Sequence, residues 1–160
     1  MSVATDTVAS LLDDYSAGPQ LVKGAVQGLT PEQLHARPIA GKWSIHEVVC
    51  HLADAEILYV DRMKRVIAED KPTLLGMDPD VHVPALARRE REVAEELLVI
   101  ELLRSQMSRI LRTLRPDEFQ RVGMHSEAGP LTLQALLARI VEHVPHHVGF
   151  IRQKREALGC

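Results

Sequence analysis

Two histidines in the last part of this sequence, His143 and His147, lie four positions apart, a spacing that suits two ligands of one metal ion. In a helix, residues four apart project from the same face with an offset of about 40°, so both imidazoles can reach a common point. The pair alone is a weak signal, because the chain contains eight histidines. It gains weight from His51, which lies between Val48 and Ala55 in the apolar pattern of another predicted helix.

Three imidazoles inside a protein need partners, because ring nitrogens removed from water must be satisfied. A divalent ion such as zinc or nickel would satisfy His51, His143 and His147 at once. In the alternative interpretation, each histidine is half-buried and hydrogen-bonded to its neighbours. The spacing leaves both interpretations open.

The other histidines are expected at the surface. His146 lies about 100° around the helix from His147, which predicts a rim or surface position, with a contact to a ligand or a substrate as the alternative. The remaining four histidines lie in predicted turns or first helical turns: His35, His46, His82 and His125. Of these, His82 could reach the site as part of a lid. Pro145 removes the helical hydrogen bond to the carbonyl of Val141, so the helix should bend there.

Four segments with apolar residues three and four positions apart must position these side chains. We expect helices over residues 4–28, 44–69, 84–114 and 131–158, separated by short segments that contain Pro and Gly. No run shows sustained two-residue alternation, so the expected fold class is all-α. Gly18 and Pro19 interrupt the first segment and predict two helical pieces rather than one continuous rod.

The segment 44–69 has the clearest start. Ser44 and Glu47 have the spacing of a capping box, and Trp43 can pack on Val48 as a hydrophobic staple. The inward stripe of this segment is Val48, His51, Leu52, Ala55, Leu58, Tyr59, Arg62, Met63 and Val66. The last segment has a similar stripe, in which histidines take aliphatic positions: Leu133, Leu136, Leu137, Ile140, His143, Val144, His147, Val148 and Ile151. In the segment 84–114, an apolar stripe alternates with Arg and Glu, which predicts a solvated outer face.

Residues 70–83 are long for a simple connection between neighbouring helices. These 14 residues span at most about 46 to 50 Å when extended, whereas a 26-residue helix is about 39 Å long. The segment could therefore run the length of a bundle and make the second and third helices parallel.

Composition limits the function classes. The 160 residues suit one domain over 1–160, and 46% of them are hydrophobic. A net charge of −3 and five aromatic residues without a basic stripe argue against nucleic-acid binding. No membrane span or secretory leader is expected from the sequence, so we predict a cytoplasmic protein in which Cys50 and Cys160 are free thiols.

Two motifs, GKWSIHEVVCHLADAE and EHVPHHVGFIRQ, stand about ninety residues apart. In order and spacing, together with the LTPEQL turn, they resemble the DinB-like superfamily, and particularly its YfiT-like metal-dependent hydrolases. The resemblance covers nearly the whole chain. It implies a four-helix bundle of up-down-down-up topology, often dimeric, with one zinc or nickel ion held by His51, His143 and His147.

The resemblance also limits the expected activity. Relatives include thiol S-transferases that use bacillithiol or mycothiol, and a maleylpyruvate isomerase. We expect a metal-dependent transferase or hydrolase acting on a small molecule, with a low-molecular-weight thiol as possible cosubstrate and a homodimeric state. A metal-binding or stress-response interaction module without turnover is the second hypothesis, and a bundle with purely structural histidines is the third. No general base is evident, because Glu142, Asp54 and Glu56 have no clear orientation toward the histidines.

Overall fold

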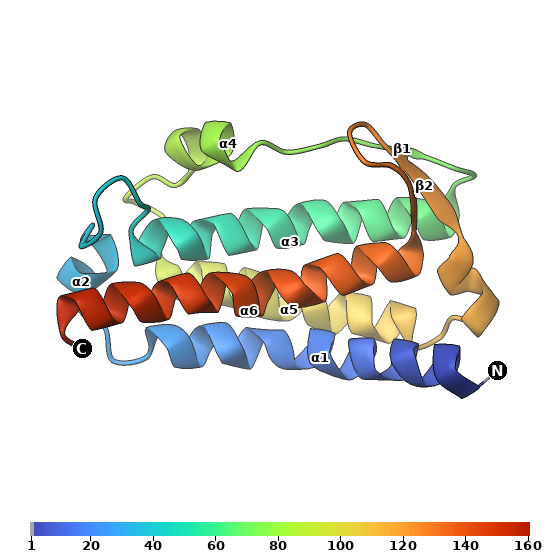
Figure 1. Ribbon diagram of the computed structural model, residues 1–160, viewed down its shortest axis with the longest axis horizontal. Coiled ribbons are helices and arrows are strands. Elements are labelled where there is room, and N and C mark those ends of the chain that lie inside the picture. Colours follow the sequence, from blue (N-terminus) through green and yellow to red (C-terminus); the bar gives the residue numbers. More distant parts are fainter. Residues whose placement is uncertain (1) are drawn as a thin grey trace.

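The protein, described here by a computed structural model over residues 2–160 with side chains from residue 7 onward, is built around four long helices (Figure 1). These are α1 (Ser2–Val26), α3 (Ile45–Ala68), α5 (Val93–Leu111) and α6 (Leu133–Leu158). Shorter elements connect them: α2 (Pro31–His35), β1 (Thr73–Leu74), α4 (Pro79–Leu86), the 3₁₀ helix η1 (Pro116–Gln120), β2 (Val122–His125) and β3 (Gly129–Thr132). The predicted four-helix bundle is confirmed.

The long helices follow an up-down-down-up order (Figure 1). Helices α3 and α5 run parallel to each other, and α1 and α6 run parallel in the opposite direction. The main contacts join α1 to α6 and to α5, and α3 to α5 and to α6. The segment after α3 returns along the outside of α3 before α5 begins, as its length predicted.

A small three-stranded sheet is an addition that the sequence patterns do not predict. β1 pairs in parallel with β2, where Thr73 faces Met124, and β2 pairs antiparallel with β3. The strands have two to four residues, too short for alternation to be visible in the sequence. Gly123 lets β2 approach closely, because a Cβ there would lie 2.7 Å from Leu74 and 2.8 Å from Val66. The sheet ties the returning segment to the end of α3.

Helix α1 continues through Gly18 and Pro19, so the predicted split is wrong. Proline removes one hydrogen bond, to the carbonyl four residues earlier, which is that of Tyr15. Nη1 of Arg104, from α5, donates to this carbonyl at 3.0 Å. A Cβ on Gly18 would lie 2.0 Å from the same Nη1, so only glycine leaves room for the guanidinium. A side chain from another helix therefore satisfies the group that Pro19 frees.

The third long helix begins at Val93 and not at residue 84, which corrects the expected boundary. Residues 79–86 form the separate helix α4, capped by the side chain of Asp78. In the intervening turn, Arg91 forms hydrogen bonds to both carboxylate oxygens of Asp54 at 3.0 Å and to Glu96 at 2.8 and 2.6 Å. These contacts hold the turn before α5 against α3. They explain why the turn is not helical although its apolar residues have helical spacing.

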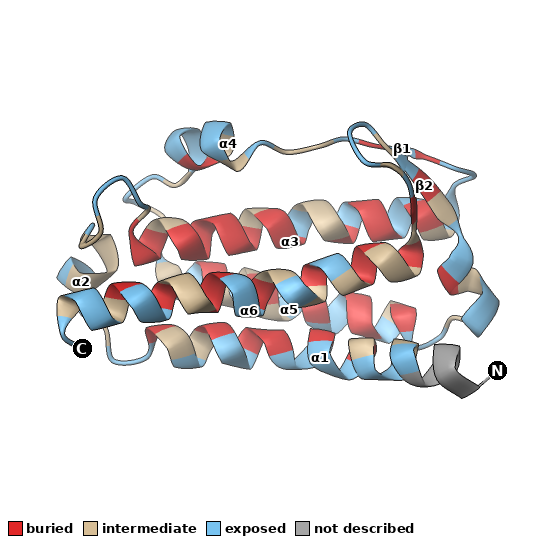
Figure 2. Ribbon diagram, viewed as in Figure 1, coloured by how far each residue is buried: buried red, intermediate tan, exposed pale blue. Residues whose placement is uncertain are grey.

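The core lies between facing sides of the four helices, where Figure 2 shows the buried bands. It has two apolar clusters, one around Tyr15, Met63 and Leu137, and the other around Ile45, Leu52 and Ile151. No helix in the described part of the chain is long and apolar enough to cross a membrane. Cys50 is buried and Cys160 exposed, and both are free thiols as predicted.

Candidate metal centre

The first candidate ligand, His51, is placed by the start of α3. The side chain of Ser44 accepts a hydrogen bond from the Glu47 amide at 3.1 Å, and the Glu47 carboxylate accepts one from the Ser44 amide at 2.7 Å. This capping box confirms the sequence prediction and fixes the rotation of the first turns. His51 then lies two turns along the inward face, 4% exposed, with its ring centroid 5.2 Å from that of Trp43.

The other two candidates lie on α6, which starts at Thr132 with a side-chain cap to the Ala135 amide. The apolar stripe of this helix faces the core as predicted. His143 is partly exposed and His147 is 8% exposed, while Pro145 between them lies on the outer side of a continuous helix. The helical period thus presents both imidazoles to α3.

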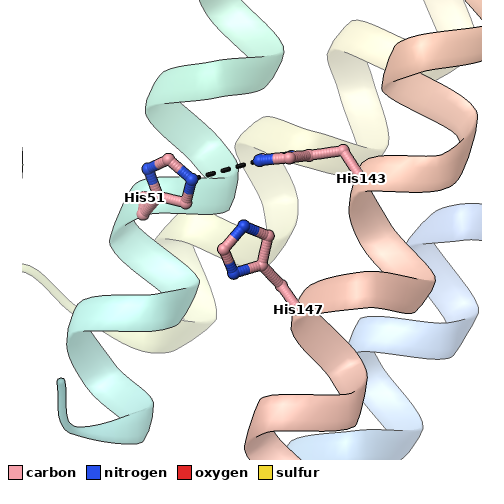
Figure 3. Close-up of side chains that lie close together, drawn as sticks. All are labelled: His51, His143 and His147. Carbon is pink, nitrogen blue, oxygen red and sulfur yellow. Dashed lines mark hydrogen bonds between the residues drawn. The ribbon is translucent and has the colours of Figure 1, made fainter. Parts of the chain in front are cut away.

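The three side chains, hereafter the candidate ligands, converge as Figure 3 shows. Nε2 of His51 lies 3.1 Å from Nε2 of His143. The ring centroid of His147 lies 4.7 Å from that of His51 and 4.4 Å from that of His143. One nitrogen from each ring can be chosen so that all three lie within 4.8 Å of one another.

This arrangement fits a divalent cation. Two imidazole nitrogens on a tetrahedral zinc ion, each about 2.0–2.1 Å from it, are separated by about 3.3 Å, close to the observed pair distance. Moreover, Nδ1 of each candidate ligand is buried and has no hydrogen-bond partner among the described residues. Polar atoms buried without partners are rare in folded proteins, but in His51 and His143 the unpartnered Nδ1 is not the nitrogen of the 3.1 Å Nε2 pair. The fit of an ion therefore rests on the convergence and the spacing of the three rings.

Burial also keeps the candidate ligands in the form that binds metal. It lowers the pKa of His143 to about 4, with His51 adding a smaller effect of the same sign. Burial lowers the pKa of His147 further, and the pKa of His51 falls for the same reason, against a small opposing effect of Asp54. At neutral pH the three rings are therefore neutral and offer lone pairs.

The remaining histidines only partly follow their predictions. His146 is exposed, as expected for a rim position, and its ring packs at 4.7 Å on Phe150. His46 contradicts its predicted surface position, since it is 2% exposed and its Nε2 lies 2.8 Å from the carbonyl of Arg91. The turn before α5 folds over it, which a pattern local to α3 cannot reveal. His82 bonds to the backbone of its own helix, at the Asp78 carbonyl.

None of the three carboxylates near the candidate ligands in sequence is free to act as a base beside them. Asp54 is paired with Arg91. Glu56 is 1% exposed and accepts hydrogen bonds from Tyr15 at 2.6 Å and from Arg104 at 2.8 Å. Glu142 is exposed on the outer side of α6. Other titratable side chains lie on the wall of the adjoining cavity.

That cavity, of about 450 Å³, opens directly over the candidate ligands. It is a size that suits a small molecule. Beyond the candidate ligands its wall contains Trp43, Ala55, Leu58, Tyr59, Arg62, Met77, Pro79, His125, Glu127 and His146. A second cavity of about 320 Å³ shares Trp43 and His147 with it and is bordered by Lys154 and Phe150.

Comparison with known proteins agrees with this geometry. The model of the DinB superfamily matches residues 14–151. The chain belongs to the DinB superfamily. This confirms the resemblance drawn from the two sequence motifs.

Two bacterial proteins resemble the chain over most of its length. One from Bacillus subtilis, named "Putative metal-dependent hydrolase YfiT", is 27% identical over 142 residues, which cover 88% of this chain and 80% of that protein. One from Oceanobacillus iheyensis, with the same description, is 29% identical over 133 residues, covering 83% and 77%.

Solved structures extend the comparison to the fold. The structure of YfiT, described as a probable metal-dependent hydrolase with an unusual four-helix bundle topology, superposes with a TM-score of 0.88 at 25% identity, covering 95% of this chain and 87% of that one. A second DinB-like protein of Bacillus subtilis has a TM-score of 0.63 at 15% identity and covers 94% and 93%, which supports the shared fold alone.

Proposed function

We propose that this chain is an enzyme that acts on small molecules through one divalent metal ion held by His51, His143 and His147. The observation that carries the proposal is the convergence of three imidazoles, two buried and one partly exposed, on the wall of a cavity of about 450 Å³. The names of the relatives, which describe metal-dependent hydrolases, support the same reading.

The metal proposed is zinc or nickel, because both bind neutral imidazoles well. When bound by three protein ligands, such an ion has an open position and lowers the pKa of a water or thiol placed there. The protein's own part is to keep the three rings neutral, to hold them at the observed spacing and to surround the reacting atoms with Trp43, Leu58 and Tyr59.

Thiol transfer is the reaction we put first. Two cavities meet at His147 and Trp43, so two small molecules can approach the same point from different sides. In the transfer, the sulfur of a low-molecular-weight thiol forms a bond to an electrophilic carbon, the leaving group departs with its electron pair, and the thiol proton passes to solvent. Such thiols are kept reduced in the cytoplasm, which we propose as the location.

Hydrolysis is the second candidate, and the names of the relatives favour it. It needs a single organic substrate and water, for which the larger cavity alone is sufficient. A metal-binding module without turnover is the remaining alternative.

One set of assays separates these functions. The zinc-loaded and nickel-loaded proteins are incubated with a chlorodinitrobenzene electrophile and bacillithiol, mycothiol or glutathione, and separately with p-nitrophenyl esters. Thioether formation that depends on His143 identifies a transferase, and ester cleavage alone identifies a hydrolase. His82→Ala is the control, because His82 lies outside both cavity walls. A metal-loaded protein inactive in every assay would favour the binding module.

Metal removal should lower the melting temperature. An ion that binds only the folded state adds RT ln(1 + [L]/Kd), about 2.7 kcal/mol at a hundredfold excess over Kd. Thermal unfolding followed by circular dichroism, before and after chelation, measures the change. An unchanged melting temperature after verified removal would contradict a site within the core.

The metal-free protein should also lose stability as the pH falls below about 6.5, the ordinary histidine value. Burial holds the pKa of His143 at about 4 in the folded state, so the unfolded chain takes up protons first. A group whose folded pKa is lowered in this way favours unfolding as the pH decreases from 6.5 toward 4. Melting curves at pH 7.5 and 5 measure the slope, and a flat profile would contradict the buried, neutral state.

A second copy of this chain is the proposed protein partner. Leu98 and Leu102 lie one turn apart on the outer face of α5 and are 52% and 61% exposed. Exposed leucines at this spacing suit a helix packed against its symmetry mate. We expect a dimeric mass in light scattering at micromolar concentration and a monomeric mass for Leu102→Glu. A monomeric wild type would contradict the proposal.

A further inference from the structure

Arg62 is a charged residue in the buried stripe of α3. It is 5% exposed and lies three turns after His51, on the wall of the same cavity of about 450 Å³. Its neighbours in the stripe are apolar or aromatic. Arginine is seldom buried unless it is paired, so this position needs an explanation.

The contacts of Arg62 leave part of its hydrogen-bonding capacity unused. One terminal nitrogen donates to the carbonyl of Leu75, and the guanidinium lies 5.0 Å from the ring centroid of Tyr59. Nε is buried and has no hydrogen-bond partner in the described part of the chain. An N–H buried without an acceptor costs free energy, which a bound ligand with an oxygen acceptor would recover.

The charge of Arg62 also lacks a counter-ion. Within residues 7–160, no carboxylate forms an ion pair with it, whereas the buried Arg104 pairs with Glu56 at 2.8 Å, and Arg91 pairs with Asp54 and Glu96. A buried charge without a partner is strongly unfavourable, and arginine does not escape by losing its proton.

The charged groups that face Arg62 do not neutralise it. The Tyr59 side chain favours its charged form most, Glu127 on the hairpin turn attracts it more weakly, and Arg139 on α6 opposes that attraction. His125, at the end of β2, shares the cavity wall, and both Glu127 and Arg139 are exposed to solvent. The charge of Arg62 is therefore not cancelled by the charged groups around it. Arg62 remains a buried positive charge on the side of the cavity away from Trp43.

We infer that Arg62 anchors an anionic group, best a carboxylate, of the molecule that occupies this cavity. The guanidinium presents parallel N–H donors that match the two oxygens of a carboxylate. This assignment rests on the proposed function, because it places the anionic end of the substrate at Arg62 and its reacting end at the candidate ligands. It restricts the substrate class to elongated small molecules that carry a negative charge at one end.

The required length follows from helix geometry. His51 and Arg62 are eleven residues apart, a rise of about 16 Å between their Cα atoms. Helical side chains lean toward the N-terminus of their helix, so the Arg62 side chain reaches back in the direction of His51. A chain of several carbon atoms is therefore needed to touch both, and a compact anion such as acetate cannot do so.

The test uses two thiols, 6-mercaptohexanoate and 6-mercaptohexanol, and the matching compounds without sulfur, hexanoate and hexanol. Isothermal titration of the zinc-loaded protein should give at least about tenfold tighter binding of the mercapto acid than of the mercapto alcohol, the gain of one charge-assisted contact. Arg62→Met should abolish this preference and leave the affinity for the alcohol unchanged. Arg62→Lys should retain part of it. Arg65→Met is the matched control, because Arg65 lies on the same helix with an exposed side chain.

A second measurement does not depend on the metal. Hexanoate, added to the metal-free protein, should shift the Arg62 Nε–H resonance in a nitrogen–proton correlation spectrum, whereas hexanol should not. Arg62→Lys identifies the resonance, so the measurement does not require Arg62→Met to fold.

The two measurements separate this inference from the proposed function. If neither thiol binds the zinc-loaded protein but hexanoate shifts Arg62, the proposed function fails and the anion site stands. If both thiols bind equally and the resonance does not move, the anion site is refuted and the metal centre stands.

Discussion

Replacing any candidate ligand by alanine should remove most of the bound metal from the purified protein, whereas His146→Ala should keep the wild-type stoichiometry. The three ligand variants are His51→Ala, His143→Ala and His147→Ala. Even a group that only orients a ligand is worth about 10- to 100-fold in metal affinity, so loss of a ligand itself should exceed that range. Elemental analysis of the four variants measures the effect.

His146 is the informative control in this series, because it is adjacent to His147 and has the same chemistry. The structure places His147 in the interior at 8% exposure and His146, which is exposed, at the rim of the cavity. Loss of metal in His146→Ala together with retention in His147→Ala would mean that the register of α6 is wrong. Circular dichroism of each variant verifies that the helices remain formed.

Arg104→Met should reduce the free energy of unfolding by about 3–5 kcal/mol, the usual cost of removing one partner of a buried ion pair. Arg104 is 1% exposed and touches all the other long helices: Nε donates to Glu56 on α3, Nη1 to the Tyr15 carbonyl on α1, and Nη2 to the Ile140 carbonyl on α6. Its removal leaves the Glu56 carboxylate buried with only the Tyr15 hydroxyl.

Urea unfolding at neutral pH measures this loss, with Arg112→Met as the control. Arg112 forms an ion pair with Asp13 at 3.0 Å on the protein surface. The Arg112 side chain is 47% exposed and the Asp13 side chain is 75% exposed. Exposed pairs contribute about 0–1 kcal/mol, so the control should stay close to the wild type. An Arg104→Met variant as stable as Arg112→Met would refute the role of Arg104 as the link between the helices.

The sequence predicts the helices that hold the candidate ligands, because their apolar residues repeat with the helical period. The stripe that contains His51 and the stripe that contains His143 and His147 are both confirmed as inward faces. The start of α3 is confirmed as well, since a capping box is a local interaction between Ser44 and Glu47. These two helices made a meeting of three imidazoles possible, and the resemblance to the DinB-like superfamily implied it.

Features that depend on contacts between distant segments could not be predicted in this way. In the sequence, Arg104 has the pattern of a surface residue, and Arg62 is a charged residue within an apolar stripe. Their buried contacts become visible only when the helices are packed together. His46 is buried only because Arg91 and its turn lie over it. The continuity of α1 through Pro19 has the same origin, since the missing hydrogen bond is replaced by a side chain 89 positions away from Tyr15.

The parallel packing of α1 against α6 has a consequence for the rate of folding. These helices are the first and the last of the bundle, and Arg155 donates a hydrogen bond to the carbonyl of Ala25 across 130 positions of sequence. Bundles whose helices pack in chain order fold quickly, because most of their contacts close short loops. Here the core can form only when the first and the last helix have come together. We therefore expect this protein to refold more slowly than a helical bundle of equal size whose helices are joined by simple hairpins.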